Sequence, residues 1–401
     1  MFLSKLRNKK EVISWSLYDF ANQPFTTIIV TFVYGAFFTS VIASDENTGT
    51  LLWTWGIAST AIIVSILSPI LGALADKGGF RKFFLILFTW ICAIFSILLY
   101  FPQSGDVFFA LSLFVIANIS FELGSVFCNS YLQDLSEDSN IGKISGFAWG
   151  LGFVGGLLAL FISLSLFELN SVGIRGINIL VGVWFLIFSI PTFIFVKDRK
   201  KDKLTKKHFV DSFVSIKTTF KEVVKYKIIM KFLIARLFFN DGLITIFALG
   251  GIYAVDTLDF TFDEVMMLGI ILNVSASIGS FIFGYLEDKI GVKRVINISL
   301  IVLVFSTLLA FIAPYFTFQK EIFWVAGVLI GLMVGPNQSC SRSLMAKLTP
   351  KEKQNEFFGF FALTGKATSF LGPILFGIIT FNFSQQVALW VVIFLFLIEK
   401  M

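Results

Sequence analysis

Six ionisable side chains lie inside otherwise apolar stretches of this sequence: Asp19, Glu122, Arg236, Asp241, Arg342 and Lys366. A charge at the centre of a membrane helix costs ~2.5–3.5 kcal/mol, so such a group is seldom kept there without a role. Carboxylates can hold an ammonium group, and guanidinium or amine groups can hold a carboxylate. The set therefore suits the binding of a zwitterionic solute, with Asp19 and Asp241 recurring in the first apolar stretch of each half.

Polar residues near Glu122 follow one helix face, because Asn118, Glu122, Ser125 and Asn129 recur every three or four positions. Such a stripe must face water or protein and not lipid. Glu122 is a candidate proton carrier, but it can equally pair with Lys366 or Arg236 and stiffen a helix bundle. The predicted substrate or proton path comprises Asp19, Asn22, Glu122, Asn129, Arg236, Asp241 and Lys366.

A short pattern occurs twice at identical internal spacing, as Gly72-Ala-Leu-Ala-Asp76-Lys-Gly-Gly79-Phe-Arg81-Lys82 and as Gly284-Tyr-Leu-Glu-Asp288-Lys-Ile-Gly291-Val-Lys293-Arg294. The first glycine of each copy allows close helix approach, and the later one permits a tight turn. Asp76 ends its helix, where the helix dipole disfavours an anion, so it needs a partner such as Arg81 or the N-terminus of another helix. We expect a breakable gate built from Gly72, Asp76, Arg81, Gly284, Asp288, Arg294 and Arg342. Arg342 can alternatively extend to the membrane surface from the end of its apolar stretch.

These residues must be positioned by membrane helices, because 56% of the chain is hydrophobic and only 14% is charged, which a soluble core cannot accommodate. Crossing the hydrocarbon region takes about 20 apolar residues. Twelve predicted spans cover residues 14–43, 52–75, 82–102, 107–133, 144–167, 176–196, 228–255, 264–287, 294–314, 321–346, 355–379 and 385–399. The sequence thus predicts an all-α integral membrane protein with two six-helix bundles, residues 1–196 and 228–401. A basic linker with an amphipathic helix joins them at 197–227.

Orientation follows from Lys and Arg, which gather in alternate loops and leave only Arg175 and Lys320 on the other side. Both termini and the 197–227 linker are therefore expected in the cytoplasm. The net charge of +6 reflects this topology and does not indicate nucleic-acid binding. Short loops and a Lys-, Ile- and Phe-rich composition favour a bacterial inner (plasma) membrane.

The repeated loop resembles the signature of the major facilitator superfamily between its second and third helices and between its eighth and ninth. Further motifs narrow the resemblance: Trp15-Ser-Leu-Tyr18-Asp19-Phe-Ala-Asn22, Asn240-Asp241-Gly242, Ser341-Arg342-Ser343, Glu356-Phe-Phe-Gly359-Phe and Gly365-Lys366-Ala-Thr-Ser-Phe-Leu-Gly372-Pro373. Together they resemble the vacuole-effluxer branch, relatives of autophagy protein twenty-two. Gln23 and Pro24 depart from that pattern, which leaves the geometry beyond Asn22 open, and Gly372-Pro373 is expected to mark a kink.

This resemblance implies a two-bundle secondary transporter with alternating access, in which Asp76 and Asp288 help to hold one bundle against the other. We expect a small polar solute, an amino acid or a related metabolite, with a proton as a candidate coupling ion and lipids as the surroundings. An exporter of amphipathic drugs or lipids is the alternative within transport, and a transport-inactive scaffold or sensor is the alternative outside it. An enzyme is disfavoured, because the sequence has no phosphate-binding loop, metal cluster or Ser/His pair. No cofactor, metal, nucleic acid or obligate protein partner is expected.

Overall fold

The chain is predominantly helical in the described part of a computed structural model, which covers residue 6 and residues 8–167, 170–198 and 226–398. Eleven helices in this part are long and apolar enough to cross a membrane, and a twelfth apolar helix, Gln385–Leu397, is shorter at 13 residues. Each predicted span overlaps one of these helices, and the last is short, as expected. The predicted amphipathic linker helix falls at residues 199–225, outside the described residues.

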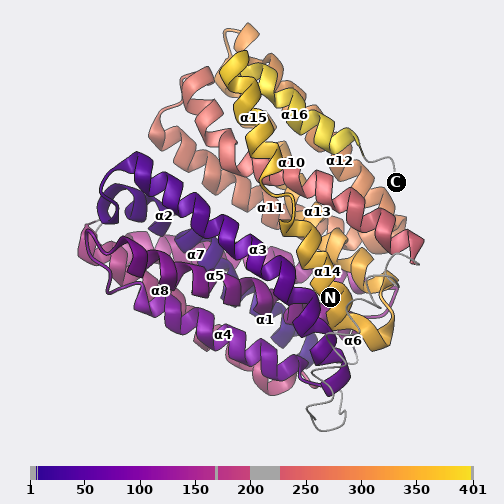
Figure 1. Ribbon diagram of the computed structural model, residues 1–401. Helices are drawn as coiled ribbons and strands as arrows, with labels where there is room; N and C mark the ends of the chain where they lie inside the picture. Colours follow the sequence, from indigo (N-terminus) through magenta and orange to yellow (C-terminus); the bar gives the residue numbers. More distant parts are fainter. Residues whose placement is uncertain (1–5, 7, 168–169, 199–225, 399–401) are drawn as a thin grey trace. The chain divides into compact units, whose positions relative to one another are not determined.

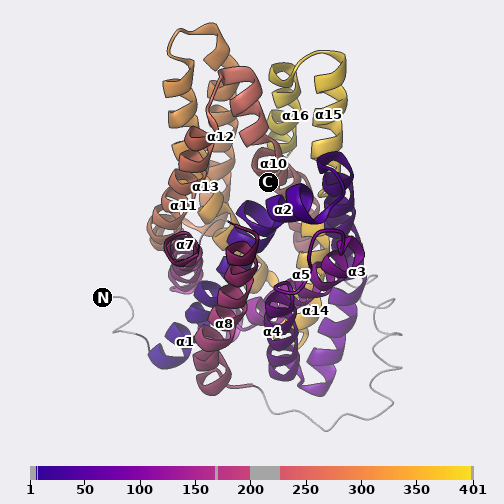
Figure 2. The ribbon, with the colours of Figure 1, turned by 90° about the vertical axis from the view of Figure 1, so that its left-hand side faces the viewer.

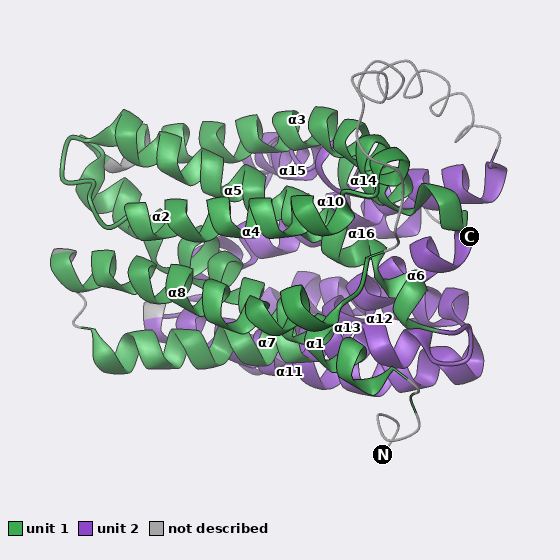
Figure 3. Cartoon of the chain, turned by 90° about the horizontal axis from the view of Figure 1, so that it is seen from below, with its two compact units in different colours: residues 1–136, 151–220, 349–363 green, residues 137–150, 221–348, 364–401 purple. Residues whose placement is uncertain are grey.

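The described helices fall into two compact units, drawn in different colours in Figure 3. Unit 1 comprises residues 1–136, 151–220 and 349–363, and unit 2 comprises residues 137–150, 221–348 and 364–401. Two segments therefore cluster with the helices of the opposite predicted half: 137–150 with unit 2 and 349–363 with unit 1. The physical reason is a pair of polar contacts at the start of each segment, described below.

Unit 1 is built from the first six predicted spans, whose order can be followed by colour in Figure 1. Its helices are α1 (Lys9–Pro24), α2 (Tyr34–Phe37), α3 (Glu46–Gly78), α4 (Arg81–Leu98), α5 (Val107–Ser130), α6 (Leu132–Leu135), most of α7 (Ile141–Leu166), α8 (Ser171–Phe195) and the first part of α14 (Gln354–Lys366). α1 packs on α8, and α4 packs on α5 and α8. Two buried hydrogen bonds tie this core together, from the Trp15 indole to the Cys128 carbonyl (2.8 Å) and between the Tyr18 and Thr89 hydroxyls (2.7 Å).

Unit 2 contains α10 (Lys227–Leu258), α11 (Phe262–Ile290), α12 (Val292–Ile312), α13 (Gln319–Leu348), α15 (Leu371–Asn382), α16 (Gln385–Leu397) and the start of α7. Figure 2 shows α11, α12 and α13 as neighbours, and α13 packs against both of the others. α11 begins with a capping box between Thr261 and Glu264, which satisfies backbone donors of its first turn.

The first span departs from regular α-helix. Beyond Pro24 the first span continues as π-helix over Phe25–Phe32 and again over Phe38–Ile42. Proline lacks the N–H that an α-helix would bond, and its ring clashes with an earlier carbonyl. The backbone therefore continues after Pro24 as the wider π-helix. The geometry beyond Asn22, left open by the sequence, is therefore irregular.

The outer surface is apolar, as expected for helices surrounded by lipid. On α3, for example, Trp55, Ile62 and Ile66 are 62%, 62% and 59% exposed. Apolar side chains are stable in this position only where hydrocarbon replaces water.

Candidate functional site

The two copies of the repeated loop make the same contact with two different helices. In unit 1, Asp76 lies in the last turn of α3 and accepts the backbone N–H groups of Asn355 (3.2 Å) and Glu356 (2.8 Å). These are the second and third residues of α14. A helix N-terminus carries a partial positive charge, so it stabilises the carboxylate that its own helix end disfavours.

In unit 2, Asp288 lies in the last turn of α11 and accepts the N–H groups of Gly142 (2.9 Å) and Lys143 (3.1 Å). These are the second and third residues of α7, and the Lys143 amine also lies 3.5 Å from the carboxylate. The loop of the first half thus binds a helix of the second half, and the loop of the second half binds a helix of the first.

Glycines set the approach of the helices at both contacts. A Cβ on Gly72 would come within 2.7 Å of the Asn355 carbonyl carbon, and one on Gly284 within 2.8 Å of the Gly142 carbonyl oxygen. Either side chain would force the helices apart. Gly79 and Gly291 have positive φ angles of 69° and 93°, so both form the predicted tight turns.

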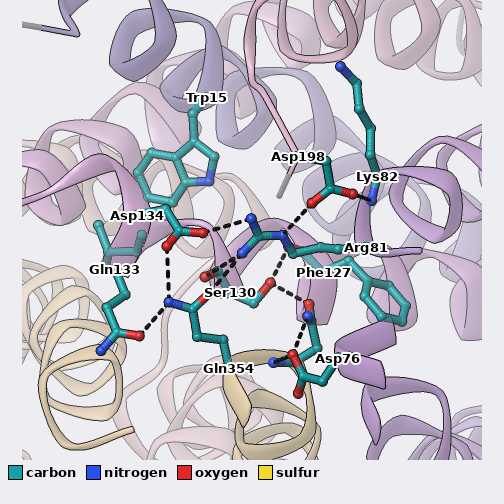
Figure 4. Close-up of polar contacts among 12 residues, drawn as sticks. Trp15, Asp76, Arg81, Lys82, Phe127, Ser130, Gln133, Asp134, Asp198 and Gln354 are labelled. Carbon is teal, nitrogen blue, oxygen red and sulfur yellow. Dashed lines mark hydrogen bonds and ion pairs between the residues drawn. The ribbon is translucent and has the colours of Figure 1, made fainter. Parts of the chain in front are cut away.

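Arg81 is buried and joins the start of α4 to a wider polar network (Figure 4). Its guanidinium donates to Asp134 (2.7 Å) and to the Gln354 side chain (2.9 Å), and it lies 3.4 Å from Asp198. The guanidinium also stacks 3.6 Å from the centroid of the Tyr131 ring. Several acceptors and one aromatic face offset the desolvation of this buried cation.

The start of α14 is therefore held at several points beyond Asp76. Gln354 donates to Gln133 and Asp134, and Asn355 donates to Asp76 (2.7 Å) and accepts from the Ser130 hydroxyl (2.6 Å). The sequence reasoning missed these partners. Uncharged Gln and Asn at a helix start carry no signal that links them to a loop so distant along the chain.

Arg342, one of the predicted gate residues, is 2% exposed in α13 and bonds to the start of α7. Its side chain donates to the Ser145 hydroxyl (3.0 Å) and to the Ser145 carbonyl (2.8 Å), and it lies over the Trp149 ring. Arg342 thus reaches into protein and not to the membrane surface. Arg294, by contrast, is exposed in the first turn of α12.

An ion pair with a buried carboxylate next to the second loop was also missed. Glu287 is fully buried, and its carboxylate lies 3.5 Å from the Lys347 amine. Ala75 occupies the corresponding position in the first loop, so the two loops differ at this point. The sequence shows that Glu287 is an ionisable residue where the first loop has alanine, but only the packing shows that it is buried.

The second cluster of predicted residues surrounds a break in the eleventh span. The helix ends at Lys366 and resumes at Leu371, so residues 367–370 separate α14 from α15. Gly372 and Pro373, predicted to mark a kink, lie instead in the first turn of α15, where a proline needs no N–H partner. The Gly372 N–H donates to one oxygen of the buried Asp241 carboxylate (2.9 Å).

Three further side chains converge on this break within unit 2. Asn240 donates to the Gly365 carbonyl (3.0 Å) and accepts from Gln338 (3.2 Å), while Arg236 donates to the Thr364 hydroxyl (3.4 Å). The second Asp241 oxygen, Oδ1, is buried without a hydrogen bond within the described part of the chain. A carboxylate, a guanidinium, two amides and a helix N-terminus therefore gather at one interrupted helix.

The first-half candidates lie on two helices of unit 1. Asn22 is buried on α1, and Asp19 is half-buried one turn before it. On α5, Glu122 and Asn129 are half-buried, and Asn118 is buried on the same stripe. No group of three or more His, Cys, Asp or Glu side chains suited to a metal ion occurs among the described residues.

Sequence comparison finds one matching family and several relatives along most of the chain. The family described as vacuole effluxer Atg22 like matches residues 46–142 and 133–399. The uncharacterized MFS-type transporter YxiO of Bacillus subtilis (strain 168) is 28% identical over 383 residues, covering 92% of this chain and 88% of the relative. Autophagy-related protein 22 of Kluyveromyces lactis is 25% identical over 353 residues, covering 80% of this chain and 72% of the relative.

Solved structures of the same fold extend over almost the whole chain. A bacterial homologue of the iron transporter ferroportin, in an outward-facing state, superposes with a TM-score of 0.74 at 14% identity and covers 98% of this chain and 96% of its own. The proton:xylose symporter XylE gives 0.73 at 14% identity, covering 97% and 93%. At this identity the likeness shows the fold alone, and it confirms the predicted major facilitator fold.

Proposed function

We propose that this chain, which belongs to the Atg22-like family of vacuole effluxers, moves an amino acid or a related metabolite across a membrane by alternating access. It is a multi-pass membrane protein and an MFS-type transporter, a class that binds small-molecule solutes, and its relatives indicate no enzymatic family. The alternating-access cycle is argued from the contacts of Asp76 and Asp288, and the solute class is argued from the side chains at the break between α14 and α15.

The observation that carries the proposal is the paired contact of Asp76 and Asp288. Each carboxylate takes two consecutive N–H groups at the start of a helix from the other half. A charged hydrogen bond contributes about 1.5–3 kcal/mol, which is strong enough to hold a closed state and weak enough to be broken in each cycle. We assign these two contacts to a gate at one end of the substrate path. Its other residues are Gly72, Arg81, Gly284, Arg294 and Arg342.

The break between α14 and α15 supports a zwitterionic solute. Asp241 keeps one buried oxygen without a hydrogen bond within the described residues, which suits an ammonium group. Arg236, at the same break, suits a carboxylate. Interrupted helices in transporters expose backbone groups to bound solutes in the same manner. Asp19, Asn22, Glu122, Asn129 and Lys366 are assigned to the remainder of the substrate or proton path.

The side of the gate follows from its charge. Basic residues crowd the ends of the gate helices, and their bias favours the cytoplasm for that side and for both termini. These residues are Lys77, Arg81, Lys82, Lys289, Lys293 and Arg294. We propose a bacterial inner membrane, with residues 1–196 and 228–401 as duplicated halves joined by the 197–227 linker.

The proposal is tested by counterflow. Proteoliposomes preloaded with an unlabelled amino-acid mixture receive the labelled mixture at two external pH values, with Asp241→Asn as the variant. Asp256→Asn is the matched control, because Asp256 lies on the same helix but is exposed and bonds to Gln385.

We expect uptake by the intact protein and a loss of about 10-fold or more in Asp241→Asn, since a charged hydrogen bond to the solute is removed. Asp256→Asn should transport normally, and a change of rate with external pH would identify a coupled proton. No uptake by the intact protein would overturn the amino-acid assignment and favour an exporter of amphipathic compounds. Uptake unchanged by Asp241→Asn would remove Asp241 from the site.

A further inference from the structure

A groove of about 470 Å³ opens among four helices of unit 2, and its lining includes neither the loop aspartates nor the residues at the break between α14 and α15. Its floor is apolar and buried, formed by Phe232, Ala235 and Leu344. It lies where α10 and α12 begin and where α13 and α16 end, so it is at one end of these membrane helices.

The rim of the groove faces the surroundings of the protein. Ile228, Ile234 and Ile398 line it and are 60%, 50% and 42% exposed. In a membrane protein, apolar side chains exposed on the outer face of helices contact acyl chains. The groove is therefore open to the hydrocarbon region and is shaped to take an apolar chain from it.

Two exposed lysines also line the groove, Lys231 in the second turn of α10 and Lys293 in the first turn of α12. Neither first turn contains an acidic residue. The partial positive charges of two helix N-termini therefore add to two ammonium groups at one end of an apolar groove. Tyr226 precedes α10 and is 41% exposed, a position typical of aromatic residues at the membrane–water interface.

We infer that this groove binds an anionic phospholipid, with an acyl chain along Phe232, Ala235 and Leu344 and the headgroup phosphate between Lys231 and Lys293. Both parts of the ligand contribute, because the apolar floor holds an acyl chain that a free anion lacks, and the lysines attract a headgroup of net negative charge more than a zwitterionic one, whose ammonium group offsets its phosphate. Juxtamembrane lysines attract anionic lipids in general, and the groove makes this attraction local.

The test is native mass spectrometry of the full chain in detergent, titrated with phosphatidylglycerol or with phosphatidylethanolamine of identical acyl chains. The double variant Lys231→Gln/Lys293→Gln removes both ammonium groups. Lys289→Gln is the control, because Lys289 is an exposed lysine near the end of α11 that pairs with the Tyr285 ring and does not line the groove.

The intact protein should bind phosphatidylglycerol more tightly than phosphatidylethanolamine. The double variant should lose about 30-fold in phosphatidylglycerol affinity, from the attraction of two lysines, and should no longer discriminate between the lipids. Lys289→Gln should behave as the intact protein. Equal binding of both lipids by the intact protein, or undiminished phosphatidylglycerol binding by the double variant, would overturn the inference.

A second variant tests the acyl chain separately. Ala235→Phe fills the floor and leaves both lysines in place, so binding of both lipids should fall together. Unchanged binding of both lipids by a folded Ala235→Phe protein would show that no acyl chain lies in the groove. Its thermal unfolding, compared with that of the intact protein, establishes that it is folded.

Discussion

At the scale of single residues, the charge of Asp76 matters more than its shape. Its two carboxylate oxygens each accept one backbone N–H at the start of α14, and an asparagine of the same shape would keep only one of these acceptors and lose the charge. Because charged hydrogen bonds are stronger than neutral ones by about 1 kcal/mol, Asp76→Asn should weaken the closed gate and slow turnover about 5- to 10-fold. Substrate affinity, measured as the half-saturating concentration in counterflow, should change less than 2-fold.

The control for this substitution is Asp106→Asn, because Asp106 is exposed before α5 and its side chain accepts a local bond from the Gln103 N–H. Asp106→Asn should leave turnover and affinity unchanged. Equal losses of turnover and affinity in Asp76→Asn would contradict its assignment to a gate and place it at the solute.

At the scale of elements, the helix contacts depend on the absence of two side chains. Gly72→Ala would drive a methyl group against the Asn355 backbone and separate α3 from α14. Overpacking of this kind costs about 1–3 kcal/mol, so the thermal unfolding midpoint in detergent should fall by several degrees. Gly284→Ala should do the same between α11 and α7, because its methyl group would meet the Gly142 carbonyl oxygen.

Gly377→Ala is the matched control for both substitutions. A Cβ on Gly377 in α15 meets nothing within 4 Å, so the helix should gain about 0.5–1 kcal/mol from the lower entropy of the unfolded chain. Its unfolding midpoint should rise or stay constant. A fall of the same size in all three variants would show that the close approach at Gly72 and Gly284 has no special role.

At the scale of the whole molecule, the proposed gate consists of two contacts that share no partner among the described residues. Asp76 and Asp288 belong to different units and bind different helices. Free-energy changes at sites without shared partners usually add within about 0.3–0.5 kcal/mol. In the double variant Asp76→Asn/Asp288→Asn, the fold-changes in turnover of the two single variants should therefore multiply, as measured by initial counterflow rates.

The opposite outcome of the double-variant experiment would also be informative. A double variant no slower than the slower single variant would mean that only one of the two contacts holds the closed state during transport. The matched charge control is Asp106→Asn combined with either single variant, which should add nothing.

The sequence by itself determined the apolar helices, the duplicated loop and the kind of partner that its aspartate requires. These properties are local, because hydropathy over about 20 residues predicts a span and the dipole of a helix disfavours an anion at its own end. The tight turns at Gly79 and Gly291 followed from the same local reasoning and are confirmed.

Only the tertiary structure decided which helix each aspartate binds, because that choice depends on packing between segments far apart in the chain. Asp76 was expected to pair with Arg81 or with some helix N-terminus, and the structure selects α14 and gives Arg81 to Asp134 and Gln354 instead. The sequence likewise predicted the interruption of the eleventh span at Gly372 and Pro373, a few residues beyond the observed break after Lys366. Glycine and proline lower the local stability of a helix, but they do not fix the residue at which it ends. Where the helix actually stops is settled by distant partners such as Asp241, which accepts the Gly372 N–H where the helix resumes.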